Sequence, residues 1–170
     1  LFRMLFEFLP DPVVITDPQT KLPYMFNKAA HELLGYSTEE FEKLSIKDYE
    51  AIEDLQEIQK HIETIFSNGA GTFETKHRTK DGTLLDIAVS VQIIYLKEKP
   101  YLLSVHRDIT QTKKYERDLR FQKQRLNAII EGTNIGTWEW DIQLGSMIYN
   151  ERWAEIIGYT LEELFPTSID

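Results

Sequence analysis

Residues 26–41 read FNKAAHELLGYSTEEF, and residues 149–164 repeat them in outline as YNERWAEIIGYTLEEL. Six identities align at a constant offset of 123 positions, from 27 to 150: Asn27, Glu32, Gly35, Tyr36, Glu39 and Glu40 match Asn150, Glu155, Gly158, Tyr159, Glu162 and Glu163. This offset is too long for a solenoid repeat and fits a domain with its linker. The sequence therefore predicts two related units in tandem.

Each copy carries the same helix signals. Asn27 can cap a short helix, and Gly35 falls where that helix should end in a residue of positive φ. Ser37 and Glu40 then form a capping box that begins a second short helix. The second copy has the same residue classes at Asn150, Gly158, Thr160 and Glu163. A strand-like segment precedes each copy, VVITD at 13–17 and GTWEWD at 136–141.

The segments between the copies complete one domain. Residues 54–66 place apolar side chains at helical spacing, and Asn68-Gly69 ends that helix. Three strands are predicted after it, at 73–78, 85–95 and 101–109, because apolar residues alternate there with polar ones. Turns are expected at 80–82 and 97–100.

Residues 111–131 contain no proline or glycine and predict a continuous helix. Along this helix, a stripe of mostly apolar residues recurs at alternating intervals of three and four positions, a heptad seam formed by Thr112, Tyr115, Leu119, Gln122, Leu126 and Ile129. Such a seam fits a short coiled coil, and it fits a plain connecting helix equally well, since three heptads are marginal for self-association.

Four segments in this order and spacing resemble the PAS domains of bacterial and archaeal signalling proteins. They are LPDPVVITD at 9–17, FNKAAHELLGYSTEEF at 26–41, KHRTKDGT at 76–83 and RDITQTKKYERDL at 107–119. The resemblance implies an α+β fold: a five-stranded antiparallel sheet in the order 2-1-5-4-3, with helices packed on one face and a linker helix after it. We expect a flanking helix at 1–9, a PAS domain at 10–110, the linker helix at 111–131, and the first part of a second PAS domain at 132–170.

The resemblance also implies a regulatory function. PAS domains hold a small ligand or cofactor between sheet and helices, dimerise, and pass a change through the helix that follows the last strand. Here that exit is Asp108-Ile109-Thr110. We expect a homodimer through residues 1–9 and the linker helix, and an output domain such as a histidine kinase or diguanylate cyclase outside the chain. The alternative is a PAS domain without ligand that acts only in dimerisation and relay.

Strand alternation predicts that Phe73, Thr75, His77, Ile87, Val89 and Val91 face the ligand pocket. The resemblance to flavin-binding relatives implies that His106 on the last strand also faces the ligand, together with Leu102 and Ser104. His77 and His106 either orient an anionic or hydrogen-bonding small molecule or are core histidines satisfied by backbone or water. We expect them to lie too far apart to share a metal ion, because another strand separates theirs by two spacings of ~4.8 Å.

Several chemistries are excluded by what the sequence lacks. It has no cysteine, which removes disulfides, thiolate metal sites and the covalent flavin adduct of light-sensing LOV relatives. Haem-binding relatives use a histidine on the long helix, but His61 does not align with their ligand. No phosphate loop, HExxH pattern or nucleophile elbow occurs, so we expect no enzyme activity in this chain. The sequence specifies no cofactor.

Charge and hydropathy limit the partners. The net charge of −9 disfavours nucleic acid and anionic lipid. No apolar run approaches the ~20 residues of a membrane span, and the first residues do not resemble a secretory signal. We expect a cytoplasmic module without direct membrane contact, taken from a longer protein.

Overall fold

The computed structural model describes residues 2–164, in which two compact units meet in sequence at Lys114 and Tyr115. Residue 1 of the expected flanking helix and residues 165–170 of the expected second PAS domain lie outside the described residues. Among the described helices, none is long and apolar enough to cross a lipid bilayer.

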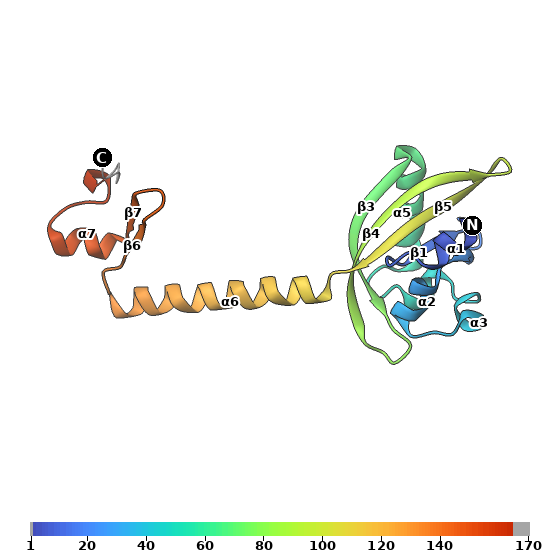
Figure 1. Ribbon diagram of the computed structural model, residues 1–170, viewed down its shortest axis with the longest axis horizontal. Coiled ribbons are helices and arrows are strands. Elements are labelled where there is room, and N and C mark those ends of the chain that lie inside the picture. Colours follow the sequence, from blue (N-terminus) through green and yellow to red (C-terminus); the bar gives the residue numbers. More distant parts are fainter. Residues whose placement is uncertain (1, 165–170) are drawn as a thin grey trace. The chain divides into compact units, whose positions relative to one another are not determined.

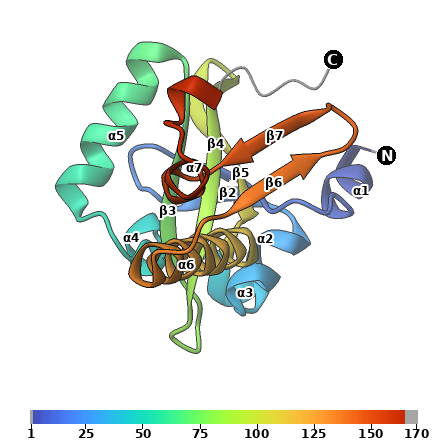
Figure 2. The same cartoon turned by 90° about the vertical axis from the view of Figure 1, so that its left-hand side faces the viewer.

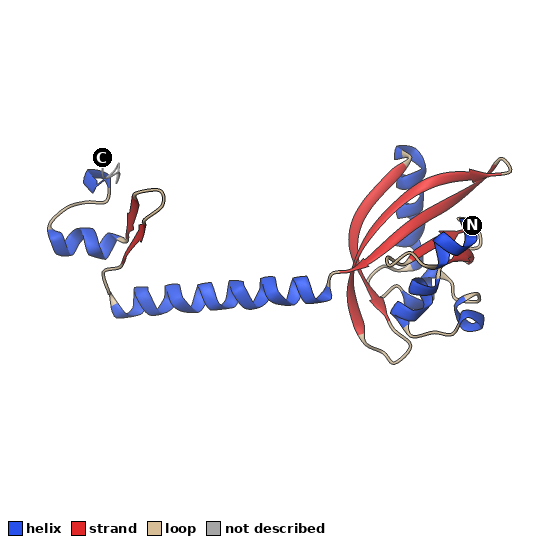
Figure 3. Ribbon diagram, viewed as in Figure 1, coloured by secondary structure: helices blue, strands red, loops and turns tan. Residues whose placement is uncertain are grey.

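The first unit is built on a five-stranded antiparallel sheet (Figure 3). Its strands are β1 (Val13–Thr16), β2 (Pro23–Phe26), β3 (Ala70–Arg78), β4 (Leu84–Leu96) and β5 (Lys99–Asp108). Their order is β2-β1-β5-β4-β3, which confirms the predicted PAS-type sheet. The long strands β3, β4 and β5 curve around the helices (Figure 1).

Short helices and one longer helix complete this unit. They are α1 (Phe2–Glu7), α2 (Lys28–Leu34), α3 (Thr38–Phe41), α4 (Ile46–Tyr49) and α5 (Leu55–Asn68). α5 runs beside β3 and β4 (Figure 2), and Ile58, Ile62 and Ile65 pack from it onto the sheet. Each such buried side chain contributes about 1.5–3 kcal/mol of hydrophobic free energy, so this stripe fixes α5 on the sheet.

Both ends of α2 and the end of α5 follow the predicted residues, and the start of α5 adds a cap that was not predicted. Asn27 accepts a hydrogen bond from the backbone N–H of Ala30, and Gly35 ends α2 at φ +75°. Asp54 forms a capping box at the start of α5, and Gly69 ends that helix at φ +80°. A residue with a Cβ is strained at such φ values, which explains the two glycines.

The turn between β4 and β5 is shorter than expected. Only Lys97 and Glu98 form it, with φ values of +48° and +66°. Two consecutive residues of positive φ make the tight hairpin whose twist matches that of the strands. Lys99 and Pro100 therefore belong to β5, where Pro100 pairs with Tyr95.

The linker helix α6 (Thr110–Thr133) extends one residue earlier and two residues later than the sequence predicts, and none of its side chains is buried. The second unit continues with a hairpin of β6 (Trp138–Asp141) and β7 (Ser146–Tyr149). The helix α7 (Glu151–Ile157) and a single 3₁₀ turn, Glu162–Leu164, follow.

Candidate functional site

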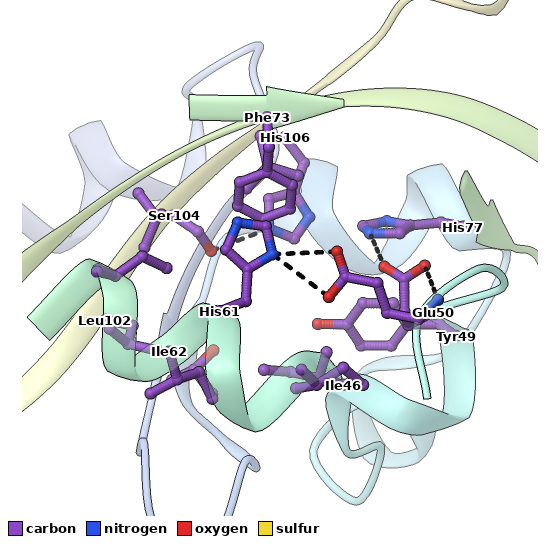
Figure 4. Close-up of a pocket in the computed structure, with 16 residues that line it drawn as sticks. Ile46, Tyr49, Glu50, His61, Ile62, Phe73, His77, Leu102, Ser104 and His106 are labelled. Atoms are coloured by element: carbon purple, nitrogen blue, oxygen red, sulfur yellow. Dashed lines mark hydrogen bonds and ion pairs between the residues drawn. The ribbon is translucent and has the colours of Figure 1, made fainter. Parts of the chain in front are cut away.

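A cavity of about 70 Å³ lies in the first unit between the sheet and the helices α4 and α5 (Figure 4). This volume holds a few water molecules or a molecule of a few heavy atoms. Its walls come from the strands β1, β3, β4 and β5, the helices α4 and α5, and the loop between these helices: Thr16, Ile46, Tyr49, Glu50, Glu53, Ile58, His61, Ile62, Ile65, Phe73, His77, Val89, Val91, Leu102, Ser104 and His106.

Seven of the nine residues expected at the pocket line this cavity: Phe73, His77, Val89, Val91, Leu102, Ser104 and His106. The other two are buried beside it. Thr75 donates a hydrogen bond to Glu50, and Ile87 is fully buried in the core cluster under α5. They therefore support the wall without forming its surface.

The two cavity histidines are in contact. The ring centroids of His77 and His106 lie 5.2 Å apart, with their planes at 67°. The wide separation expected from strand spacing is therefore wrong. The long strands are curved (Figure 1), and on a curved sheet side chains of the inner face converge. Even so, the described residues contain no group of three potential ligands that could hold a metal ion.

The hydrogen bonds of His106 define its tautomer. The hydroxyl of Ser104 donates to the backbone oxygen of Val14 at 3.2 Å. The 2.9 Å contact between His106 Nε2 and Ser104 Oγ therefore requires Nε2 to carry the proton and donate. Burial, with a smaller effect of His77, lowers the pKa of His106 to about 3, so the ring is neutral at pH 7 and its Nδ1 is an acceptor.

A buried carboxylate stands opposite the histidines. The side chain of Glu50 is 4% exposed. Its Oε1 accepts hydrogen bonds from the hydroxyl of Thr75 at 2.7 Å and from the backbone N–H groups of Ala51 and Ile52 at 2.9 Å each. The other oxygen, Oε2, lies 3.8 Å from His77 Nε2, too far for a hydrogen bond.

His77 is held as a neutral ring beside that carboxylate. Burial lowers the pKa of His77 to about 4, and its Nδ1 is buried without a hydrogen-bond partner among the described residues. The ring packs edge-on against Tyr49, with centroids 4.9 Å apart. Burial, followed by the charges of Glu50 and Asp48, raises the pKa of Tyr49, so its hydroxyl stays protonated.

A more exposed histidine–carboxylate pair borders the cavity. His61 Nδ1 lies 3.0 Å from Glu53 Oε1, and the two side chains are 31% and 21% exposed. The His61 ring lies against Phe73 with centroids 4.0 Å apart (Figure 4). Because these groups touch both solvent and cavity, they form its polar rim.

Sequence reasoning missed the carboxylate side of the site. Tyr49, Glu50 and Glu53 lie in a short segment that also contains Asp48 and Asp54, and such a charged run is typical of a solvated surface. No periodicity identified Glu50 as buried. Only its burial opposite β3, where its backbone forms an isolated bridge to His77, shows its role.

Hydrogen bonds connect the end of β5 to the start of α6 at Asp108, Ile109 and Thr110, a segment that we call the joint. Asp108 Oδ1 accepts from the backbone N–H of Thr110 at 2.8 Å. Thr110 Oγ1 in turn accepts from the N–H of Asp86 on β4 at 2.9 Å, and the N–H of Ile109 donates to the Asp86 backbone oxygen at 2.9 Å. The start of α6 is thus fixed to two neighbouring strands.

Ion pairs reinforce this joint on the outer face of the sheet. Lys113 in the first turn of α6 pairs with Glu74 on β3 at 2.6 Å, and Lys76 on β3 pairs with Asp86. Strands β3, β4 and β5 therefore all contact the first turn of the helix, directly or through one side chain.

A model of the PAS domain family matches residues 10–111 of this sequence. The chain belongs to the PAS domain family. It is 31% identical over 131 residues to a methyl sulfide methyltransferase-associated sensor of Methanosarcina acetivorans, covering 76% of this chain and 13% of that protein. It is 25% identical over 134 residues to a probable diguanylate cyclase, DgcE, of Escherichia coli, covering 76% of this chain and 12% of that one. The chain thus spans about an eighth of these relatives.

The fold agrees with solved PAS structures. The PAS domain of an HTR-like protein from Haloarcula marismortui superimposes with a TM-score of 0.59 at 23% identity, over 64% of this chain and 88% of that one. Residues 10–111 are therefore a PAS sensor domain, a regulatory type of module, and nothing in the comparisons points to catalysis within it.

Proposed function

We propose that this PAS domain binds a small ligand in the cavity and relays the change through α6 to an output domain. The observation that carries the proposal is a single strand: His106 on β5 lines the cavity, and Asp108, two residues later, accepts a hydrogen bond from the N–H of the first residue of α6. A strand rises about 3.3 Å per residue, so cavity wall and joint are separated by only about 7 Å.

The joint suits a relay because it is rigid. A displacement of His106 moves the strand that holds Asp108, and the bonds of Ile109 and Thr110 to Asp86 make β4 share that movement. The first turn of α6 then shifts with both strands. These hydrogen bonds would pass a movement of β5 to α6 without forming any new contact.

The output domain is proposed by analogy. One relative is named as a sensor and another as a probable diguanylate cyclase. We infer that a histidine kinase or diguanylate cyclase domain outside this chain receives the signal, and that this chain itself is not an enzyme. Residues 132–170 would begin a second PAS domain, a proposal supported by the cap of α7 at Asn150 and the stop at Gly158.

A homodimer fits the exposed apolar side chains of the two flanking helices. Met4, Leu5 and Phe8 at the first helix are 61–78% exposed. Tyr115, Leu119, Leu126 and Ile129 on α6 are 49–72% exposed. Sedimentation at high concentration should show a dimer that Leu119→Glu with Leu126→Glu converts to monomer. A wild-type chain that stays monomeric would contradict this arrangement.

The alternative function is a PAS domain that relays a signal without a ligand. The small cavity favours it, since about 70 Å³ is well below the 300–1,000 Å³ of an ordinary small-molecule site. The polar lining favours the sensor, since a filled core would not need Glu50, His77 and His106 inside it.

Native mass spectrometry and a visible spectrum of the purified chain separate these functions. The sensor predicts a small molecule that is retained by the wild type and by His31→Leu, which removes a histidine outside the cavity. The same molecule should be lost from His106→Leu. A colourless chain without bound mass, whose thermal midpoint ignores a metabolite panel, would leave the relay function.

A further inference from the structure

The two oxygens of the Glu50 carboxylate have different surroundings. Among the described residues, Oε2 accepts no hydrogen bond, whereas Oε1 is surrounded by donors. His77 Nε2 lies 3.8 Å from Oε2, beyond hydrogen-bond distance. A carboxylate oxygen that is buried in this way and faces a cavity is placed to accept a hydrogen bond from whatever occupies the cavity.

The wall of the cavity does not balance the charge of Glu50. No lysine or arginine is among the described residues that line it. The rings of His77 and His106 are desolvated and neutral at pH 7. His61, at the rim of the cavity, is already paired with Glu53. A buried charge without a counterion is costly, so a cationic occupant would stabilise this site.

The other polar atoms of the cavity wall also favour a ligand that donates hydrogen bonds. Nδ1 of His106 is an acceptor because its Nε2 carries the proton. An anion, one of the two ligand classes considered from the sequence, would meet the Glu50 carboxylate and no opposing positive charge. The rings of Tyr49 and Phe73 and the side chains of Ile62 and Leu102 supply aromatic and apolar surface around the same space. Aromatic faces beside a carboxylate suit an organic ammonium ion.

We infer that the cavity binds a compact organic ammonium ion, whose N–H groups donate to Glu50 Oε2 and whose alkyl part lies against Ile62 and Leu102. This inference rests on the proposed sensor function and names its ligand class. The 70 Å³ volume restricts the ion to a few heavy atoms. A ligand of three heavy atoms reaches a dissociation constant on the order of 1 mM at best.

Isothermal titration of the full chain tests this with three probes of similar size: ethylammonium chloride, ethanol and sodium acetate, at matched ionic strength. We expect millimolar binding of ethylammonium, with ethanol and acetate at least about tenfold weaker. Glu50→Gln keeps the shape of the side chain and should weaken ethylammonium binding about tenfold or more. Glu63→Gln, an exposed change on α5, should leave it unaltered.

A second measurement does not depend on the variant folding. In wild-type protein, ethylammonium should shift the imidazole ¹⁵N resonances of His77 and His106 and leave that of His31 unchanged. Equal binding of all three probes, or an unchanged His77 and His106 spectrum, would overturn the ammonium assignment. Binding of acetate alone would overturn it while keeping a ligand-responsive sensor. Ethylammonium binding without any change at α6 would support the ligand class and count against the relay.

Discussion

Asn27 in the first unit and Asn150 in the second perform the same local task. Each Oδ1 accepts one N–H from the helix it caps and one from the segment before it: Ala30 and Val13 for Asn27, Trp153 and Thr137 for Asn150. Each Nδ2 also donates to a backbone oxygen upstream, that of Asp11 or of Ile135. Each copy of the repeat thus contains the same hydrogen-bond network around its asparagine, which we call the hub.

Their surroundings differ. Every residue of β1 is buried, and Asn27 is fully buried with it. Every residue of β6 is exposed, including Trp138 and Trp140 at 53% and 47%. β1 pairs on both sides, with β2 and β5, whereas within the described residues β6 pairs only with β7. Local sequence builds the hub, but distant strands supply the burial on which stability depends.

The largest expected effect comes from acid, and it should act on the first unit alone. All four histidines lie in that unit. His77 and His106 have pKa values lowered to about 4 and about 3 in the fold, against 6.5 when unfolded. The unfolded chain therefore binds more protons below pH 6.5. Their stabilisation is complete above pH 6.5 and is lost as the pH falls toward 4, roughly 5 kcal/mol for both between pH 7 and pH 4.5.

Denaturant unfolding at pH 7 and pH 4.5 measures this loss. Amide resonances of β4 and β5 report the first unit, and tryptophan fluorescence reports the second, because all three tryptophans lie there. The double variant His77→Gln with His106→Gln should lose most of the pH dependence of the first unit, whereas His31→Gln should keep it. An unaltered pH dependence in the double variant would contradict the buried neutral histidines.

Replacing Asn27 or Asn150 should destabilise the two units to different extents, and both losses should be smaller than the effect of acid. Asn27→Ala leaves the N–H of Val13 and the backbone oxygen of Asp11 buried without their partner, and we expect a loss of roughly 3 kcal/mol in unfolding free energy. Asn150→Ala removes a half-exposed cap and should cost about 1 kcal/mol, seen by tryptophan fluorescence. Equal losses of unfolding free energy in the two units would mean that the burial of Asn27 does not add to the stability that it provides.

The smallest effect is expected at the joint. Thr110→Val removes the oxygen that accepts from the N–H of Asp86 and should cost about 1 kcal/mol. Hydrogen exchange of the Asp86 amide should become faster in this variant. Thr112→Val, which changes an exposed threonine two residues further along α6, should leave that exchange rate unchanged. Protection of Asp86 that survives Thr110→Val would show that the joint is held by other contacts.

The sequence was sufficient where structure is decided within a few residues. Asn27, Gly35 and Gly69 each occupy the cap that their chemistry predicts, and alternation placed His77 on the inward face. It failed where distance depends on the whole sheet. The contact between the two histidine rings requires the curvature of strands far apart in sequence, which no local pattern encodes.

The buried carboxylate illustrates the same limit. Glu50 lies in an acidic segment with no apolar period, and it is buried only because Thr75 and the backbone N–H groups of the following residues satisfy Oε1. Those donors come from a loop and a distant strand. A polar residue buried by its partners is not distinguishable from a solvated one until those partners are placed.

The central claim is that a change in the cavity reaches α6 along β5. Hydrogen exchange of the amides from Ile109 to Lys113 tests it most directly, in the wild type, in His106→Leu, and in Ile65→Val, which alters the cavity wall on α5 instead. We predict faster exchange at these amides in His106→Leu, little change in Ile65→Val, and no change in α7 of the second unit. Unchanged exchange from Ile109 to Lys113 in a folded His106→Leu variant would contradict the account.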